Sequence, residues 1–263
     1  MSAIEHQTKI CYTQKKVGTI PIGGSDKIKR TNEIKIAAPL LDAIDIQSKT
    51  ITADALLTQH KFADYLVQEH KAHYHFTAKG NQAILLGDIK LFFEDRKEPD
   101  YVDQSSGEHG RIEVRKIWVT TELNDYLDFP HVGQSFAIEC QITNKKTGKQ
   151  SREIAYGITS KNPDQCNPQS LLSTNRNHWT IENSCHYVID WNFDEDRSRI
   201  RTGYSPENIT RLRRFAVGII KAKKIRSVAQ KIRELNHSIR LVFDYLKMTK
   251  NSQGHHMAPQ SGN

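Results

Sequence analysis

Between residues 49 and 93 the sequence alternates twice between a strand-like run and a helix-like run. Residues 49–53 form a short β-branched run that predicts a strand, and residues 55–68 have helical character. Residues 72–78 predict a second strand and residues 83–93 a second helix. This order is typical of parallel strands within one α/β layer. Asp54 is then expected at the carboxyl end of the first strand, the edge at which α/β sheets bind ligands.

Residues 99–162 have a different character, because strand-like runs follow one another. Residues 111–121, 135–143 and 151–160 each predict a strand. The last two are separated by a glycine-containing turn at residues 145–149. Such an arrangement predicts an antiparallel hairpin.

The segments on either side of these two regions also have readable patterns. Residues 10–17 alternate well enough to predict a strand. Residues 31–44 predict a helix that is broken or restarted at Pro39, since proline lacks the amide hydrogen that a helix interior uses. Residues 207–223 and 227–235 have apolar positions at helical spacing, so the chain is expected to end in helices.

The charge and cysteine content limit the classes of partner and compartment. The 263 residues include 38 Lys and Arg against 30 Asp and Glu, a formal net charge of +8, which favours a polyanionic partner without proving one. The four cysteines have no paired spacing, so neither a zinc ribbon nor a disulfide scaffold is indicated. No apolar run is long enough to span a bilayer. We therefore expect a cytoplasmic protein without a membrane partner.

Residues 176–199 combine a helical pattern with a carboxylate between histidines. The apolar line that predicts the helix consists of Ile181, Cys185 and Val188. His178, Glu182 and His186 form a second line beside it, where a carboxylate suits a hard-cation ligand but also suits an ordinary surface position. Zinc is disfavoured, because two histidines eight residues apart on a helix are separated by more than two turns.

Three other histidines, His70, His73 and His75, could suggest a metal site but have a simpler explanation. His73 and His75 share one face of a predicted strand, as any residues two apart do. Structural packing is the preferred interpretation for both.

Several blocks resemble one known family when they are taken together. The blocks that carry the resemblance are Asn32-Glu-Ile34, Thr52-Ala-Asp54-Ala-Leu-Leu-Thr-Gln59, Ala78-Lys-Gly-Asn-Gln82, His109-Gly-Arg-Ile-Glu-Val-Arg115 and, from Arg176, Arg-x-His-Trp-x-Ile-Glu-Asn followed by Cys-His-Tyr and Asp-x-x-Phe-x-Glu-Asp-x-Ser-Arg. They resemble the signature blocks of insertion-sequence transposases of the ISAs-one type, also called H-repeat-associated, within the DDE superfamily. The blocks occur in the order of the family and cover most of the chain.

The resemblance implies a fold and a chemistry. The implied fold is α/β, a ribonuclease-H-like core with an antiparallel β insertion and a C-terminal helical segment. In such a core three carboxylates hold two divalent ions, Mg²⁺ or Mn²⁺, and the enzyme cuts and joins DNA. Asp54 matches the second carboxylate and Glu182 the glutamate, so both are implied catalytic residues and metal ligands. Without the resemblance, a helix cap or a turn aspartate is the preferred interpretation of Asp54.

The first aspartate of the family lies in an Asp-Gly-Lys segment, and no such segment occurs in this sequence. Asp26, Asp42 and Asp45 fall in a predicted loop or helix and are poor substitutes. We therefore expect an N-terminally truncated copy that lacks one metal ligand and has lost much or all of its activity.

The expected partner is double-stranded DNA, both insertion-sequence ends and target, with a homodimer in a synaptic complex. The stretch from Arg211 to Arg233 contains many basic residues and no acidic one. Such a basic stripe favours contacts with DNA phosphates, although a solvated helix face is also possible. Three candidates, Lys79, Asn81 and Gln82, could instead fix the loop near the metal edge. The full set of candidate DNA-binding residues is Lys79, Asn81, Gln82, Arg111, Arg176, His178, Arg211, Arg213, Arg214, Lys221, Lys223 and Lys224.

The predicted organisation has four parts. Residues 1–98 form the first part of the core, residues 99–162 the β-rich insertion, residues 163–250 the last part with the Glu182 helix and basic helices, and residues 251–263 a disordered tail. The predicted function is metal-dependent cleavage and strand transfer at insertion-sequence ends, in the bacterial cytoplasm in association with the nucleoid. The alternatives are a DNA-binding remnant without catalysis and a metal-dependent DNA nuclease of the same fold.

Overall fold

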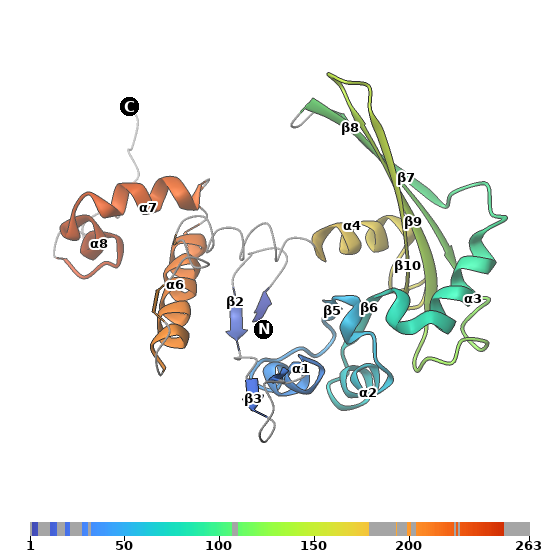
Figure 1. Cartoon of the computed structure of the whole chain (residues 1–263), viewed down its shortest axis with the longest axis horizontal. Helices are drawn as coiled ribbons and strands as arrows, with labels where there is room; N and C mark the ends of the chain where they lie inside the picture. Colours follow the sequence, from blue (N-terminus) through green and yellow to red (C-terminus); the bar gives the residue numbers. More distant parts are fainter. Residues whose placement is uncertain are drawn as a thin grey trace, which may run out of the picture. The chain divides into compact units, whose positions relative to one another are not determined.

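A computed structural model of the chain describes residues 2–4, 11–14, 19–21, 28–30, 33–106, 110–178, 193, 199–200, 204–223, 225 and 227–249 (Figure 1). The chain divides into two compact units. The first comprises residues 1–6 and 12–181, and the second comprises residues 7–11 and 182–263.

The first unit is built on a six-stranded sheet in the order β5-β6-β10-β9-β8-β7. The strands are β5 (Thr50–Ala53), β6 (His73–Ala78), β7 (Tyr101–Ser106), β8 (Arg111–Thr120), β9 (Gln134–Asn144) and β10 (Gln150–Thr159). β5 and β6 are parallel, and every other neighbouring pair is antiparallel. The predicted parallel pair and the predicted hairpin are therefore both confirmed, whereas β7 was not predicted.

The helical segment after β5 is interrupted where a single helix was predicted. It consists of the 3-10 turn η1 (Ala55–Leu57), the helix α2 (His60–Asp64) and the π-helical turn η2 (Tyr65–Glu69). Thr58, between η1 and α2, donates its hydroxyl to the carbonyl of Thr77 at 2.9 Å, and its own carbonyl accepts from the Gln82 amide at 2.8 Å. These bonds hold the backbone at Thr58 against the end of β6, so the helix cannot continue through it.

The N-terminal part departs from prediction at Pro39. The helix α1 (Glu33–Leu41) runs through Pro39 without a break. Proline removes only one helical hydrogen bond, and burial of Ile36, Ala37 and Leu40 offsets that loss. The predicted strand at residues 10–17 is the shorter β2 (Cys11–Gln14). It pairs with β1 (Ser2–Ile4), and β3 (Thr19–Pro21) pairs with β4 (Ile28–Arg30).

Two helices cover the sheet, and alternate residues of the strands supply the two cores. The helix α3 (Ala83–Phe93), which follows the turn η3 (Gly80–Gln82), has the predicted bounds and belongs to the cluster that contains Ala137. The helix α4 (Pro168–His178) was not predicted and belongs to the cluster that contains Phe136 and Ile138. Because neighbouring residues of a strand point to opposite faces, α3 and α4 lie on opposite faces of the sheet (Figure 1).

The packing interpretation is confirmed for His75. Its side chain is 2% exposed and stacks on the ring of Phe136, with ring centroids 4.5 Å apart and planes inclined by 13°. Gly157 gives that ring its space, since a Cβ atom on Gly157 would lie 2.4 Å from Cζ of Phe136. The ring of Phe136 on β9 therefore lies over Gly157 of the neighbouring strand β10 and reaches His75 on β6, the next strand beyond it.

The second unit is helical, as predicted. It contains α6 (Ser205–Ala222), α7 (Val228–Asn236) and α8 (Ile239–Tyr245). None of the helices formed by the described residues combines the length and the apolar character needed to cross a lipid bilayer. The predicted disordered tail at residues 251–263 lies outside the described residues.

Three long strands extend past the end of β6 as a ribbon, defined here as residues 111–116, 138–144 and 150–155. A buried carboxylate, Glu139, links them: it is 3% exposed and accepts from Lys116 at 3.3 Å and from Nε of Arg152 at 2.6 Å. Burial alone would raise the pKa of Glu139, but hydrogen bonds and charge from Arg152 and Lys116 outweigh it and lower that pKa below its ordinary value.

We predict that Glu139→Gln lowers the free energy of unfolding by about 1–3 kcal/mol at neutral pH, because two cations lose a charged acceptor. The native pKa of Glu139 is below that of the unfolded chain, about 4.3. Its contribution is therefore complete above that value and is lost as the pH falls through the native pKa. Urea unfolding at neutral pH and at successively lower pH values measures the change, and the difference between the two proteins should shrink as the pH falls.

Glu153→Gln is the matched control, since Glu153 is exposed on the same ribbon and has no ion-pair partner among the described residues. It should change the free energy of unfolding by no more than about 0.5 kcal/mol. Equal stability of the two variants at neutral pH would contradict the role given to Glu139.

Candidate functional site

Asp54 lies where the sequence placed it, directly after β5. Its Oδ1 atom accepts a hydrogen bond from the backbone nitrogen of Ala55 at 2.7 Å, so it caps η1. Nζ of Lys79 lies 3.6 Å from the same oxygen, and the Asp54 side chain is 74% exposed. Within the described parts of the chain, Oδ2 has no hydrogen-bond partner. The capping role therefore leaves half of the carboxylate available to a ligand.

The loop after β6 holds the backbone that follows Asp54. Nδ2 of Asn81 donates to the carbonyl of Ala55 at 2.7 Å, and Nε2 of Gln82 donates to the carbonyl of Thr58 at 2.8 Å. The side-chain amides of Asn81 and Gln82, both in η3, thus hold the backbone that follows Asp54. This arrangement matches the loop-fixing alternative for Asn81 and Gln82, while a DNA contact by Lys79 stays a prediction.

The end of α4 lies beside the carboxyl end of β5. Nδ1 of His178 is 3.1 Å from the hydroxyl oxygen of Thr52, which precedes Asp54 by two residues. These two residues are 126 positions apart in the sequence. Glu182 and His186 lie outside the described residues.

The other two candidates of the first unit have different environments. Arg176, on α4, forms an ion pair with Asp103 of β7 at 3.5 Å. It also acts on Glu113, whose pKa is below its ordinary value: burial would raise that pKa, but Arg115 foremost, with Cys140 and Arg176, lowers it. Arg111 is exposed at the first residue of β8.

Some side chains of the basic stripe between Arg211 and Arg233 pair with acidic residues. Arg211 pairs with Glu207 one turn earlier, and Lys231 pairs with Glu234 at 2.9 Å. The acidic partners lie just outside the stretch that contains none, so the prediction of a stripe of one sign was incomplete. Arg214 and Lys221 also have interaction partners, Arg213 lies over the ring of Phe193, and Lys224 lies outside the described residues.

Lys223 is held by an aromatic ring. Its Nζ lies 3.5 Å from the ring centroid of Tyr245 and donates to the carbonyl of that residue. Burial, followed by the charges of Lys247 and Lys231, lowers the pKa of Lys223 from its ordinary value. Lys223 is therefore already engaged in a contact within its own unit.

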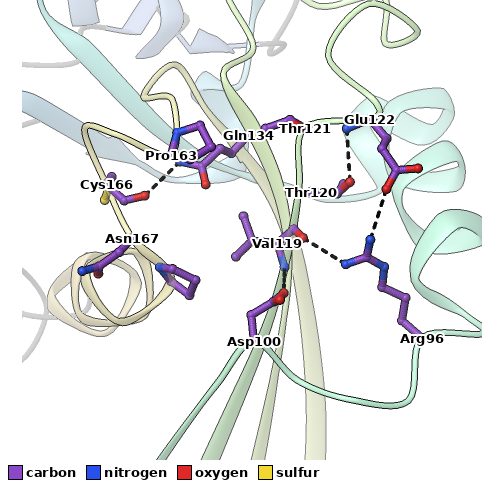
Figure 2. A pocket seen from close by; sticks show the side chains of 11 residues that line it. Arg96, Asp100, Val119, Thr120, Thr121, Glu122, Gln134, Pro163, Cys166 and Asn167 are labelled. Carbon is purple, nitrogen blue, oxygen red and sulfur yellow. Dashed lines mark hydrogen bonds and ion pairs between the residues drawn. The ribbon is translucent and has the colours of Figure 1, made fainter.

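A pocket of about 430 Å³ lies elsewhere on the first unit, at the end of β8 and the start of β9 (Figure 2). Its charged groups are engaged with one another or with backbone. Arg96 contacts the carbonyl of Val119 at 3.1 Å and Glu122 at 3.3 Å, and Asp100 accepts from the Val119 nitrogen at 2.7 Å (Figure 2). None of the predicted site residues lines the pocket, and four strand spacings separate β8 from β5.

The described residues contain no group of three His, Cys, Asp or Glu side chains that could hold a metal ion. Asp54 pairs with Lys79, and His178 contacts Thr52 two residues before it, but no group of metal-ligating side chains among the described residues includes Asp54. The predicted metal site with Glu182 therefore stays a prediction.

Residues 27–213 match the family described as Transposase DDE domain, which is well over half of the chain. The chain belongs to this transposase family. Two similar proteins come from Escherichia coli K12: "Putative protein YbfL", 28% identical over 221 residues, and "H repeat-associated putative transposase YhhI", 27% identical over 221 residues. Each alignment covers 79% of this chain and 56% of the relative. The resemblance to H-repeat-associated transposases is thereby confirmed.

This transposase chain spans about half the length of the curated relatives that it matches. Among solved structures, the "Cryo-EM structure of piggyBac transposase synaptic complex with hairpin DNA (SNHP)" aligns with a TM-score of 0.40 and 15% identity. That alignment covers 97% of this chain and 46% of the other. A similarity of this size is too low to assign a fold.

The site contains one contact that no sequence pattern indicated, the pairing of His178 with Thr52. The sequence block that contains His178 resembles the family, but its pattern does not indicate which strand the histidine contacts. By contrast, Asn81 and Gln82 were identified from their position after a predicted strand, and their hydrogen bonds to the Asp54 turn give the physical reason.

We predict that Asn81→Ala loosens the turn that carries Asp54. Removing the donor to the carbonyl of Ala55, a residue that is 4% exposed, should cost about 1 kcal/mol. Amide hydrogen exchange at residues 55–58 should then be about five times faster. Asn236→Ala, at an exposed position of the second unit, is the control and should leave these rates unchanged. Unchanged exchange in Asn81→Ala would show that the turn does not depend on this bond.

Proposed function

We propose that this chain forms part of the catalytic core of a metal-dependent DNA transposase, in which Asp54 and Glu182 are two ligands of a divalent ion at the carboxyl end of β5. The reaction is cleavage and strand transfer at insertion-sequence ends. The observation that carries the proposal is the contact of His178 with Thr52 at 3.1 Å, because it brings the block that contains Glu182 to the strand that ends at Asp54.

Covalent geometry supports the pairing of the two carboxylates. Glu182 follows His178 by four residues, and four fully extended residues span at most about 14 Å. Thr52, the residue that His178 contacts, precedes Asp54 by two. The chain therefore allows the two acidic side chains to meet at one edge of the sheet, although 127 residues lie between them in the sequence.

The chemistry of Asp54 fits a hard cation. Mg²⁺ and Mn²⁺ prefer oxygen ligands, and Asp54 offers an exposed carboxylate with one oxygen outside the η1 cap. Such an ion, when bound, polarises the phosphodiester and activates the attacking water or 3′-hydroxyl. Asn81 and Gln82 keep the turn behind the carboxylate in place, and His178 positions the segment that leads to Glu182.

Lys79 has a second role in this proposal. Its ion pair with Asp54 is exposed on both sides, so it contributes little stability, roughly 0–1 kcal/mol. With a divalent ion on Asp54, the ammonium group of Lys79 would lose its partner and would be available to a DNA phosphate. Lys79 thus links the metal site with the DNA that the metal acts on.

We propose a ribonuclease-H-like core for residues 1–98 and 163–250, with residues 99–162 as an insertion. The parallel pair β5 and β6, with helices after each strand, supports the first part. The insertion corresponds to strands β7 to β10, and it joins the core through the pairing of β10 with β6. In the described residues β5 ends the sheet, so its outer edge can accept a further strand.

The proposed partner is duplex DNA, at the insertion-sequence ends and at the target. A net charge of +8 supports it, together with the exposed basic residues Lys79 and Arg111. A homodimer in a synaptic complex and a location at the nucleoid stay predictions of the family resemblance.

A second candidate function is DNA binding without catalysis. It is favoured by the absence of an Asp-Gly-Lys segment from the 263 residues, which leaves two of the three family carboxylates. A site with two protein ligands holds a divalent ion less firmly than one with three. Both candidates require DNA binding, and they differ only in metal-dependent cleavage. A nuclease of the same fold differs again, since it cuts DNA without joining a transposon end to target.

The catalytic proposal predicts that the chain, with two of the three family carboxylates, nicks supercoiled plasmid slowly in the presence of Mg²⁺ or Mn²⁺, and that Asp54→Ala lowers this rate by more than about 100-fold. The matched control is Asp45→Asn, because Asp45 is also exposed and also accepts from a nearby backbone nitrogen, that of Gln47, at 3.0 Å. It should nick at the rate of the unchanged chain. Gel separation of supercoiled and open-circular plasmid measures the rate, and an end-labelled transposon substrate separates strand transfer from nuclease cleavage.

The outcomes distinguish the candidate functions. Salt-sensitive DNA binding without any nicking supports the non-catalytic remnant. Nicking that persists in Asp54→Ala at the original rate rules out Asp54 as a metal ligand. A preserved far-UV spectrum in Asp54→Ala excludes unfolding as the cause of a lost activity.

A further inference from the structure

The ribbon projects from the sheet on the side at which β5 ends. Tyr156 of β10 faces Ala78, the last residue of β6, so residues 150–155 continue beyond β6 without a β6 partner. Six residues of strand span about 20 Å. Because β5 runs parallel to β6, its carboxyl end and Asp54 lie at this same end of the short strands. Figure 1 shows the long strands rising away from β5 and β6.

The cations of the ribbon fall into two groups. Those lower on the strands are paired: Lys116 and Arg152 contact Glu139, and Arg115 contacts Glu113. The second group lies at the tip, where every member is exposed and has no ion-pair partner within the described parts of the chain. It consists of Arg111, Lys145, Lys146 and Lys149, called the ribbon tip below.

Hydrogen bonds donated by backbone nitrogens, two of them to a side-chain oxygen, define the turn that carries these lysines. Oδ1 of Asn144 accepts from the backbone nitrogens of Lys146 at 2.9 Å and Thr147 at 3.1 Å. The nitrogen of Lys145 donates to the carbonyl of Gly110 at 2.9 Å, which ties the turn to the chain just before β8. Gly148 supplies the positive φ, +67°, that closes the turn. The lysine side chains themselves make none of these bonds, so they are presented on a fixed turn and their charge serves no structural pair.

The composition of the tip indicates the class of partner. Residues 144–150 read Asn-Lys-Lys-Thr-Gly-Lys-Gln and contain no aromatic or large apolar side chain. Such a surface cannot stack on bases or fill an apolar pocket, but it can neutralise a row of phosphates. The nearest acidic side chains of the described ribbon are Glu113, two residues after Arg111, and Glu153, four residues after Lys149.

We propose that the ribbon tip binds the phosphate backbone of duplex DNA without reading its sequence, as a contact separate from the metal edge. It deepens the proposed function, from which it takes DNA as the polyanion. The ribbon overhangs the Asp54 end of the sheet by about 20 Å, which is close to the width of a duplex. A duplex that lies along the carboxyl end of β5 is therefore flanked by the tip.

The test compares two triple variants of equal charge change in the full chain. Lys145→Gln/Lys146→Gln/Lys149→Gln removes three tip charges, and Lys35→Gln/Lys90→Gln/Lys97→Gln removes three exposed and unpaired charges elsewhere in the first unit. Fluorescence anisotropy with a labelled duplex of about 30 base pairs gives the binding constant at several salt concentrations. EDTA is present throughout, so that binding does not depend on the metal site.

The tip variant should bind more weakly, and the slope of log K against log salt should fall by about 2–3, since each lost phosphate contact removes about 0.9. The control variant should keep its slope within about 0.5 of the unchanged chain. Arg111→Gln, from the neighbouring strand, should lower the slope by about 1. Thermal unfolding of all variants should agree, because the turn is held by Asn144 and backbone atoms.

Equal slopes for the two triple variants overturn the proposal, since they show that only net charge matters. Absence of duplex binding by the unchanged chain overturns it too. The role of Asp54 is judged separately by nicking with Mg²⁺. If the chain does not nick plasmid but the tip variant lowers the salt slope, only the catalytic proposal is rejected. If the chain nicks plasmid but the two triple variants have equal slopes, only the proposed DNA contact of the ribbon tip is rejected.

Discussion

β6 is the strand on which the arrangement of the first unit depends. One edge of it pairs in parallel with β5, and the other pairs antiparallel with β10. Its side chains Tyr74 and Phe76 are fully buried, and the carbonyl of Tyr74 accepts from the hydroxyl of Thr159 at 2.7 Å. Because the short parallel part and the long antiparallel part meet only along this strand, β6 also fixes the direction of the ribbon relative to Asp54.

The parts of the fold that could be predicted are those with a strong local pattern. α3, β5 and β8 to β10 appear where periodicity and turn residues placed them. The parts that were missed have weak patterns or tertiary causes. α4 has its apolar pair at adjacent positions, Leu171 and Leu172, rather than at helical spacing. The interruption at Thr58 depends on hydrogen bonds to Thr77 and Gln82, which no local propensity contains.

The same division applies to the candidate site. The position of Asp54 follows from a strand that ends before a helix, and the role of Asn81 follows from the strand before it. The contact of His178 with Thr52 could not be predicted, because 126 positions separate the two residues and only the folded sheet brings them together. The pairing of Arg211 with Glu207 did have a signal, a spacing of four residues on a predicted helix. The charge of a basic helical stretch therefore has to be assessed together with the residues one helical turn before and after it.

The net charge of +8 is not spread evenly over groups that DNA could use. Lys116 and Arg152 cannot turn to a phosphate without leaving Glu139, and a buried carboxylate without partners is costly. Lys223 would have to leave the ring of Tyr245. The lysines of the ribbon tip give up no partner within the described chain when they bind an anion, so the whole Coulombic gain is available for binding. Affinity for a polyanion is thus determined less by the number of cations than by how many of them the fold has left without a carboxylate.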